Sequence, residues 1–234
     1  MHTHILFDFF GTLVRYDARR TSQGYPRSHA ELVRLGATVS YADFVEGWDR
    51  TFAVFDRGSE PEDREFSMTQ VGTAYLTEVL GRVPAAGDVD AFIRGYLAEW
   101  SAGVSYPEGV VALVRSLSRV YRLAVVTNTH QPDLVPGHLA AMGVLDAMDA
   151  VVTSVEVGRR KPHPAIYAEA VQRLGIEPGA AIFVGDTYTA DFAGPEKFGM
   201  TAYLIDPAGV ADVPGDRRLG SVLDLAAKVR ASAR

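Results

Sequence analysis

Five short apolar runs constrain the fold of this chain more than any other feature. They are residues 5–7, 123–126, 150–152, 181–184 and 202–205. The runs are almost continuously apolar and do not alternate, which is typical of strands in a parallel sheet that is covered on both faces. Segments with helical spacing of apolar residues lie between them. This alternation of strands and helices predicts an α/β fold with a doubly wound parallel sheet.

The ends of three expected helices carry boundary signals. Pro164 stands at the start of one apolar stripe and Gly175 just past its end, which is the usual asymmetry of a helix. Pro107 opens another stripe, over residues 110–117. Ser221 and Asp224 have the spacing of a capping box for a last helix.

The interval from residue 15 to 105 has a different character, because it shows no convincing strand pattern. Three stretches, at residues 41–55, 71–80 and 89–100, place apolar side chains at helical spacing, and Ser40 is a plausible N-cap for the first. The pattern predicts an all-helical domain, residues 15–105, inserted into a core domain formed by residues 1–14 and 106–234. We expect the aromatic residues Trp48, Phe52 and Phe55 to form the core of that insertion.

Composition and charge narrow the class of protein. The chain has 234 residues, a net charge of -6 and no Cys, so it offers no thiolate for metal binding or catalysis. It has no long basic run, and no stretch approaches the roughly 20 apolar residues that span a bilayer. We therefore expect a soluble cytoplasmic protein that binds neither nucleic acid nor membrane. The sequence leaves open whether it is a monomer or a homodimer.

Polar residues stand at four turns beside the expected strands and helices. Asp8 comes directly after the first run, Thr127 and Asn128 follow the second, Lys161 precedes a helix, and Asp186 follows the run at 181–184, with Asp191 five residues later. Reactive groups in open α/β sheets gather at the carboxyl ends of the strands. The sequence therefore predicts one site that contains these side chains.

In this order and spacing, the four segments resemble the four motifs of the haloacid dehalogenase superfamily, whose fold is a Rossmann-like core with an inserted cap. The resemblance covers residues 4–14 and 107–206. It implies an anionic small-molecule substrate and a Mg²⁺ cofactor. The roles that it implies are Asp8 as nucleophile, Thr127, Asn128 and Lys161 as substrate contacts, and Asp8, the Phe10 carbonyl, Asp186 and Asp191 around the metal. Of these, Asp8, Thr127, Lys161 and Asp186 would be catalytic.

Phe10 departs from the pattern of the family's phosphatases, which have a second Asp two residues after the nucleophile. Phenylalanine cannot transfer a proton, and positioned acids or bases contribute about 10²–10⁴-fold. Three readings remain. Phosphoryl hydrolysis of a substrate with a good leaving group is favoured by the intact carboxylates at Asp186 and Asp191. Cleavage of a 2-haloacid is the alternative, since a halide leaves without a proton, and a non-catalytic binding protein is the third.

The inserted helical domain is expected to act as a mobile cap that selects the substrate. Five residues in or beside it are candidate contacts for a substrate anion: Arg15, Tyr16, Arg19, Arg20 and Arg50.

Overall fold

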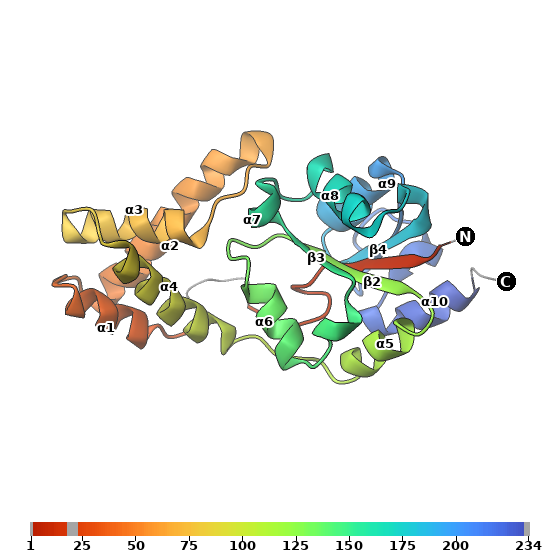
Figure 1. Ribbon diagram of the computed structural model, residues 1–234, viewed down its shortest axis with the longest axis horizontal. Coiled ribbons are helices and arrows are strands. Elements are labelled where there is room, and N and C mark those ends of the chain that lie inside the picture. Colours follow the sequence, from red (N-terminus) through yellow and green to blue (C-terminus); the bar gives the residue numbers. More distant parts are fainter. Residues whose placement is uncertain (1, 18–22, 232–234) are drawn as a thin grey trace. The chain divides into compact units, whose positions relative to one another are not determined.

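The computed structural model describes residues 2–17 and 23–231 and divides into two compact units (Figure 1). One unit comprises Met1–Arg15 and Tyr106–Arg234, and the other comprises Tyr16–Ser105. The first boundary lies one residue beyond the position expected from the sequence.

The first unit is built on a six-stranded sheet in which every pairing is parallel. Its strands are β1 (His4–Phe7), β2 (Arg122–Thr127), β3 (Ala150–Thr153), β4 (Ala181–Gly185), β5 (Thr201–Ile205) and β6 (Arg218–Leu219). Each of the five apolar runs forms a strand. The two-residue β6 was not predicted, because it is too short to give a periodic signal.

The strand order β3-β2-β1-β4-β5-β6 places β1 in the centre of the sheet, between β2 and β4. Phe7, the last residue of β1, lies opposite Val125 on one side and Val184 on the other. The chain order reverses between β1 and β4, which makes this the switch point where ligands bind in such sheets. The segments that follow β1, β2 and β4 therefore begin at the same edge.

Helices cover both faces of the sheet. They are α5 (Val110–Leu117), α6 (Leu134–Ala141), α7 (Ser154–Val157), α8 (Pro164–Leu174), α9 (Gly194–Phe198) and α10 (Leu225–Ala231). Figure 1 shows α8 and α9 on one side of the sheet and α5 and α10 on the other. Residues of β1 alternate between the two layers, since Leu6 belongs to the buried cluster that includes Ile166 and Tyr167 of α8.

The boundary signals of the sequence have structural counterparts. Pro164 is the first residue of α8, and Gly175 ends it with a positive φ of 65°. The capping box of Ser221 and Asp224 is present, but it caps a short 3₁₀ turn (Val222–Asp224) that leads into α10.

The second unit is helical, with no strand among residues 16–17 and 23–105. It contains α1 (Pro26–Arg34), α2 (Tyr41–Ser59), a 3₁₀ turn (Glu60–Glu62), α3 (Met68–Leu80) and α4 (Ala86–Ser101). Three of these helices were expected, and α1 was missed. The side chain of Ser40 caps α2, as the sequence predicted, by accepting a hydrogen bond from the N–H of Asp43.

This unit has its own aromatic core, centred on Trp48. The Trp48 ring centroid lies 5.0–5.3 Å from those of its four closest aromatic neighbours, Phe52, Tyr75, Phe92 and Tyr96. Trp48 and Phe52 are almost fully buried and Phe55 packs partly buried against them, so these aromatics form a core as expected. In the part of the chain that the structure describes, no helix combines the length and apolarity needed to cross a membrane.

Candidate active site

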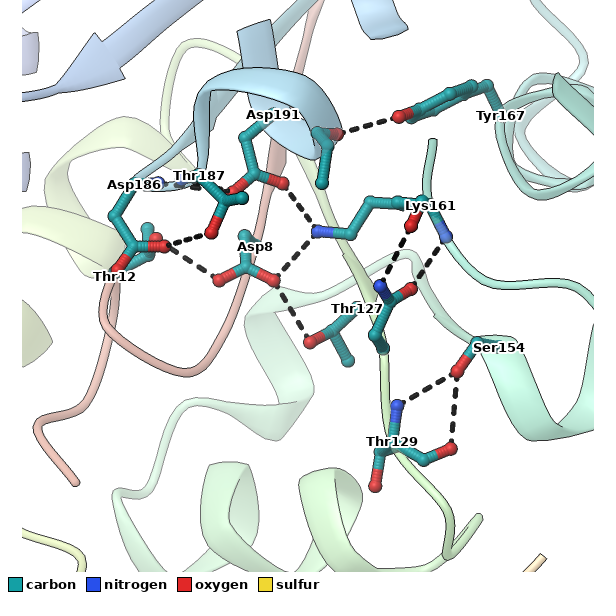
Figure 2. Close-up of polar contacts among 12 residues, drawn as sticks. Asp8, Thr12, Thr127, Thr129, Ser154, Lys161, Tyr167, Asp186, Thr187 and Asp191 are labelled. Atoms are coloured by element: carbon teal, nitrogen blue, oxygen red, sulfur yellow. Dashed lines mark hydrogen bonds and ion pairs between the residues drawn. The ribbon is translucent and has the colours of Figure 1, made fainter. Parts of the chain in front are cut away.

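Asp8 lies at the carboxyl end of the central strand and is 6% exposed. Its Oδ1 accepts hydrogen bonds from Lys161 Nζ at 2.8 Å and Thr127 Oγ1 at 3.0 Å, and its Oδ2 accepts one from Thr12 Oγ1 at 3.3 Å (Figure 2). The last residue of β2 and the segments after β1 and α7 thus converge on one carboxylate.

Lys161 is a buried ammonium group that joins two carboxylates. Its Nζ lies 2.8 Å from Asp8 Oδ1 and 2.6 Å from Asp191 Oδ1, and its side chain is only 2% exposed. Burial acts to lower the pKa of Lys161, but the charges of Asp191 and Asp8, with their hydrogen bonds, raise it above its ordinary value. Lys161 therefore stays charged in the interior.

Asn128 contacts the backbone of Lys161. Its Oδ1 accepts from the N–H of Lys161 at 2.7 Å, and its Nδ2 donates to the carbonyl of the same residue at 3.1 Å. The amide thus holds the segment that carries Lys161 at the end of β2. A contact between this side chain and a substrate anion stays a prediction.

Asp191 lies on a π-helix (Tyr188–Ala193) and is 1% exposed. Its Oδ2 accepts hydrogen bonds from the N–H groups of Asp186 at 3.1 Å and Thr187 at 2.9 Å. Gly185 makes room for it, since a Cβ there would lie 2.3 Å from the Asp191 carboxyl carbon. Asp191 thus shapes the loop that carries Asp186.

Asp186 lies at the solvent-exposed side of this group of residues. The loop after β1 approaches it so closely that a Cβ on Gly11, whose φ is +85°, would lie 2.1 Å from Asp186 Oδ2. Loss of solvation, together with the negative charges of Asp8 and Asp191, raises the pKa of Asp186 to about 6. Crowding of like charges is therefore a property of the site.

The residues present fit a divalent cation. One carboxylate oxygen each from Asp8, Asp186 and Asp191 lies within 4.8 Å of the others. Three carboxylates with one ammonium, Lys161, leave a net charge of about -2 when all are ionised, and carboxylate oxygens are the ligands that Mg²⁺ prefers. A divalent cation would neutralise the group and relieve the repulsion that, after loss of solvation, raises the pKa of Asp186.

Phe10 brings no ionisable group to this site. Its ring lies edge-to-face with that of Phe9, with centroids 5.0 Å apart. Its side chain is half-buried, in the loop between Asp8 and Thr12. The position at which the family's phosphatases have a second Asp is therefore occupied by an aromatic ring.

The five residues predicted to contact a substrate anion do not form one cluster among the described residues. Arg15 is exposed at the last residue of the first unit. Tyr16 lies beside the Trp100 ring, with centroids 6.1 Å apart. Arg50 forms an exposed ion pair with Glu78 at 2.8 Å, in a cleft also lined by Asp43 and Glu46. Arg19 and Arg20 lie outside the described residues.

Sequence reasoning missed two contributors to the site. One is Thr12, whose hydroxyl donates to Asp8 and has no role in the sequence analysis. The other is Tyr167 in the apolar stripe between Pro164 and Gly175, whose hydroxyl donates to the carbonyl of Ala190 at 2.6 Å. Helical periodicity identifies the buried ring and carries no information about the partner of the hydroxyl.

Comparisons with known proteins identify the family to which this chain belongs. A family model described as haloacid dehalogenase-like hydrolase matches residues 2–199. The chain belongs to this family of hydrolases, as the motifs predicted.

Two relatives show how far the likeness extends. Haloacid dehalogenase-like hydrolase domain-containing protein 3 of Homo sapiens is 35% identical over 114 residues, which is 46% of this chain and 45% of that protein. The chain therefore aligns with less than half of that relative. Ribulose-1,5-bisphosphate 5-phosphatase of Halopiger xanaduensis is 30% identical over 226 residues, which is 91% of this chain and 88% of that protein.

Among solved structures, the 2-haloacid dehalogenase from Pseudomonas syringae pv. tomato superimposes with a TM-score of 0.75. The match covers 99% of this chain and 100% of that one, with 21% identity. At this identity the likeness shows a shared fold.

Proposed function

We propose that this protein is a phosphatase that hydrolyses a small phosphorylated metabolite in the cytoplasm, with Asp8 as the nucleophile and Mg²⁺ as the cofactor. The observation that carries the proposal is the grouping of three carboxylates, from Asp8, Asp186 and Asp191, around one buried ammonium group. The phosphatase name of the Halopiger relative, which aligns over nearly the whole chain, supports the same reaction class.

Asp8 is suited to covalent catalysis. An oxygen of its carboxylate attacks phosphorus, the bond to the leaving oxygen breaks, and an aspartyl phosphate forms that water then hydrolyses. Lys161 pairs with Asp8 and offsets negative charge on the incoming phosphoryl group. Thr127, whose hydroxyl already points at Asp8, is placed to donate to a phosphoryl oxygen.

Asp8, the carbonyl of Phe10 and Asp186 would hold the Mg²⁺ ion, with Asp191 supporting it through the backbone of Asp186. The bound ion supplies electrostatic screening between an anionic nucleophile and an anionic phosphate. Among the described residues, this is the one group of three or more metal-binding side chains.

Phe10 favours a second candidate, 2-haloacid dehalogenation. A halide leaves as a stable anion, so the reaction needs no acid at this position. The candidate is weaker because it has no use for the unneutralised carboxylates of Asp186 and Asp191, which would repel a monocarboxylate substrate. The likeness to the Pseudomonas dehalogenase supports only the fold that both reactions share.

A substrate screen tests the proposal. Acyl phosphates, aryl and alkyl phosphate esters and 2-haloacids are assayed in parallel, with Mg²⁺ and with a chelator. We expect phosphate release that requires Mg²⁺. Asp8→Asn should reduce it by at least about 10³-fold, as loss of a nucleophile does elsewhere, and Asp186→Ala should weaken Mg²⁺ binding in calorimetry.

Asp146→Asn is the matched control, since this carboxylate is 71% exposed and pairs with Arg115 at the surface. It should leave both activity and Mg²⁺ binding unchanged. Halide release that persists in the chelator would replace the proposal with the dehalogenase reading. Absence of turnover on every substrate class would favour a binding protein.

A further inference from the structure

Tyr167 lies on α8, close to the candidate site, and its phenol ring is fully buried. Its hydroxyl donates to the carbonyl of Ala190 at 2.6 Å, and its ring lies edge-to-face with that of Phe183, with centroids 5.9 Å apart. Figure 2 shows this bond reaching the helical turn that carries Asp191. A buried Tyr hydroxyl normally finds a partner, and here the partner is a main-chain carbonyl of the π-helix.

The register of the π-helix explains why this carbonyl takes a side-chain donor. In a π-helix, each carbonyl accepts from the N–H five residues later. The N–H of Gly194 bonds to the carbonyl of Thr189 in this way. The corresponding donor for Ala190 would be residue 195, which is Pro195 and has no N–H. The Tyr167 hydroxyl supplies the donor that the proline lacks.

Gly194 allows the phenol to come this close. A Cβ at Gly194 would lie 2.4 Å from the Tyr167 Oη, so any side chain there would displace the hydroxyl. The three residues therefore depend on one another. Pro195 removes a backbone donor, Tyr167 replaces that donor with its hydroxyl, and Gly194 leaves space for the hydroxyl.

The bond joins two segments of the site. Tyr167 lies six residues after Lys161, and Ala190 immediately precedes Asp191. The Asp191 carboxylate contacts Lys161 at 2.6 Å and accepts hydrogen bonds from the N–H groups of Asp186 and Thr187. A shift of the π-helix would therefore change the ion pair of Lys161 and the loop of Asp186 together.

We propose that Tyr167 is a positioning residue. Its hydroxyl keeps the π-helix in the register that places Asp191 against Lys161 and the loop of Asp186, and so sets the affinity of the site for a divalent cation. The claim about affinity for a divalent cation rests on the proposed function, whereas the claim that Tyr167 places Asp191 is independent of it.

The test is Tyr167→Phe, which removes one oxygen and keeps the buried ring. In the metal-free protein, amide hydrogen exchange reports directly on the N–H groups of Asp186 and Thr187 that bond to Asp191. We expect their exchange to quicken by about 3–10-fold, as loss of one hydrogen bond implies, with no change in the amides of β1. Calorimetry with Mg²⁺ should show a dissociation constant raised by about the same factor.

Tyr75→Phe is the matched control. Tyr75 is also buried, and its hydroxyl donates to a helix carbonyl, that of Phe44, at 3.3 Å within the second unit. This variant loses the same kind of bond and should leave the amides of Asp186 and Thr187 and the Mg²⁺ affinity unchanged.

Pro195→Ala in the Tyr167→Phe background tests the reason for the bond. Alanine restores an N–H at residue 195, so exchange at Asp186 and Thr187 should slow again toward the wild-type rate. If exchange does not slow, the explanation that Pro195 deprives the Ala190 carbonyl of a backbone donor is wrong. Exchange that quickens equally throughout the sheet would show a general packing role and would overturn the positioning role.

The two proposals fail separately. If the wild-type protein hydrolyses no phosphate but Tyr167→Phe still loosens the amides of Asp186 and Thr187, the phosphatase proposal fails and the placement of Asp191 by Tyr167 stands. If those amides and the Mg²⁺ affinity are unchanged in Tyr167→Phe, the inference about Tyr167 fails whatever the enzyme's activity.

Discussion

Lys161 is the residue on which the electrostatics of the site depend. Two carboxylates, those of Asp8 and Asp191, lie within 2.8 Å of its ammonium nitrogen, and all three side chains are nearly excluded from solvent. Removing one partner of a buried ion pair is costly because it leaves the other charges without compensation.

Lys161→Met should therefore lower the free energy of unfolding by about 3–5 kcal/mol at pH 7 in metal-free buffer. The deficit should shrink as the pH falls toward 5. Burial already raises the pKa of Asp191, and without the ammonium group the folded-state pKa rises further above its unfolded value. Protonation then favours the folded state, and this gain disappears as the pH rises.

Chemical denaturation at several pH values measures this effect. Lys197→Met, at an exposed position on α9, is the control and should change stability little at any pH. A deficit in Lys161→Met that is independent of pH would mean that lost packing, and not uncompensated charge, causes it.

Phe10 bears on how the leaving group would depart in the proposed reaction. With no acid at this position, phosphatase rates should depend steeply on leaving-group pKa, so that aryl and acyl phosphates react far faster than alkyl phosphates. Phe10→Asp should raise kcat/KM for alkyl phosphates by about 10–10³-fold, at the low end of what general acids provide. It should slow any dehalogenation, because it adds negative charge beside Asp8.

Steady-state kinetics on both substrate classes in both proteins measures this effect. A flat dependence on leaving-group pKa in the wild type would mean that another group already supplies the proton.

The loops after β1 and β4 reach their positions because two glycines permit close approach. Gly11 lies against Asp186 and Gly185 lies against Asp191, each at a separation that leaves no room for a Cβ. The strands align the ends of these loops, and the glycines let the loops fold inward until three carboxylates share one site.

Gly185→Ala should displace the Asp191 side chain, because the new methyl group would lie 2.3–2.5 Å from its carboxyl group. We expect a loss of about 1–3 kcal/mol in the free energy of unfolding, as overpacking of a core produces, together with weaker Mg²⁺ binding. Gly137→Ala in α6 is the control, since nothing lies within 4 Å of its added Cβ and a helix favours alanine. Thermal unfolding measures the stability of the two variants, and calorimetry measures their Mg²⁺ binding. Equal stability of Gly185→Ala and Gly137→Ala would contradict the expectation.

The molecule consists of two units, each with its own buried core. One cluster lies between the sheet and α8, and another surrounds Trp48 in the helical unit. The chain passes between the units at residues 15–16 and 105–106. Units with separate cores move relative to each other unless a large interface prevents it, and a helical cap that closes over a substrate would exclude water from the reaction.

Limited proteolysis tests this mobility. The first cuts should fall near the two connections, before any cut within the strands or within α2, α3 and α4. Added inorganic phosphate with Mg²⁺ should slow these cuts if the cap closes over the occupied site. Equal protection along the whole chain would argue against a mobile cap.

The sequence was sufficient to predict the five longer strands, the helical insertion and the residues that gather at the sheet edge. Apolar runs and helical spacing report burial directly, and parallel strands bring their carboxyl ends to one edge whatever their order along the chain. The strand β6 escaped prediction because it has only two residues. Helix α1 escaped because, of its two buried residues, Ser28 and Leu32, only one is apolar.

The tertiary structure decided which partner each polar group takes. The amide of Asn128 bonds to the backbone of Lys161, and the hydroxyl of Tyr167 bonds to the carbonyl of Ala190. Neither pairing has a sequence signal, because hydrogen bonds between residues more than 20 positions apart depend on how strands and helices pack. Charges and apolar runs thus indicate where a site forms, whereas its geometry depends on the packing that satisfies each buried donor and acceptor.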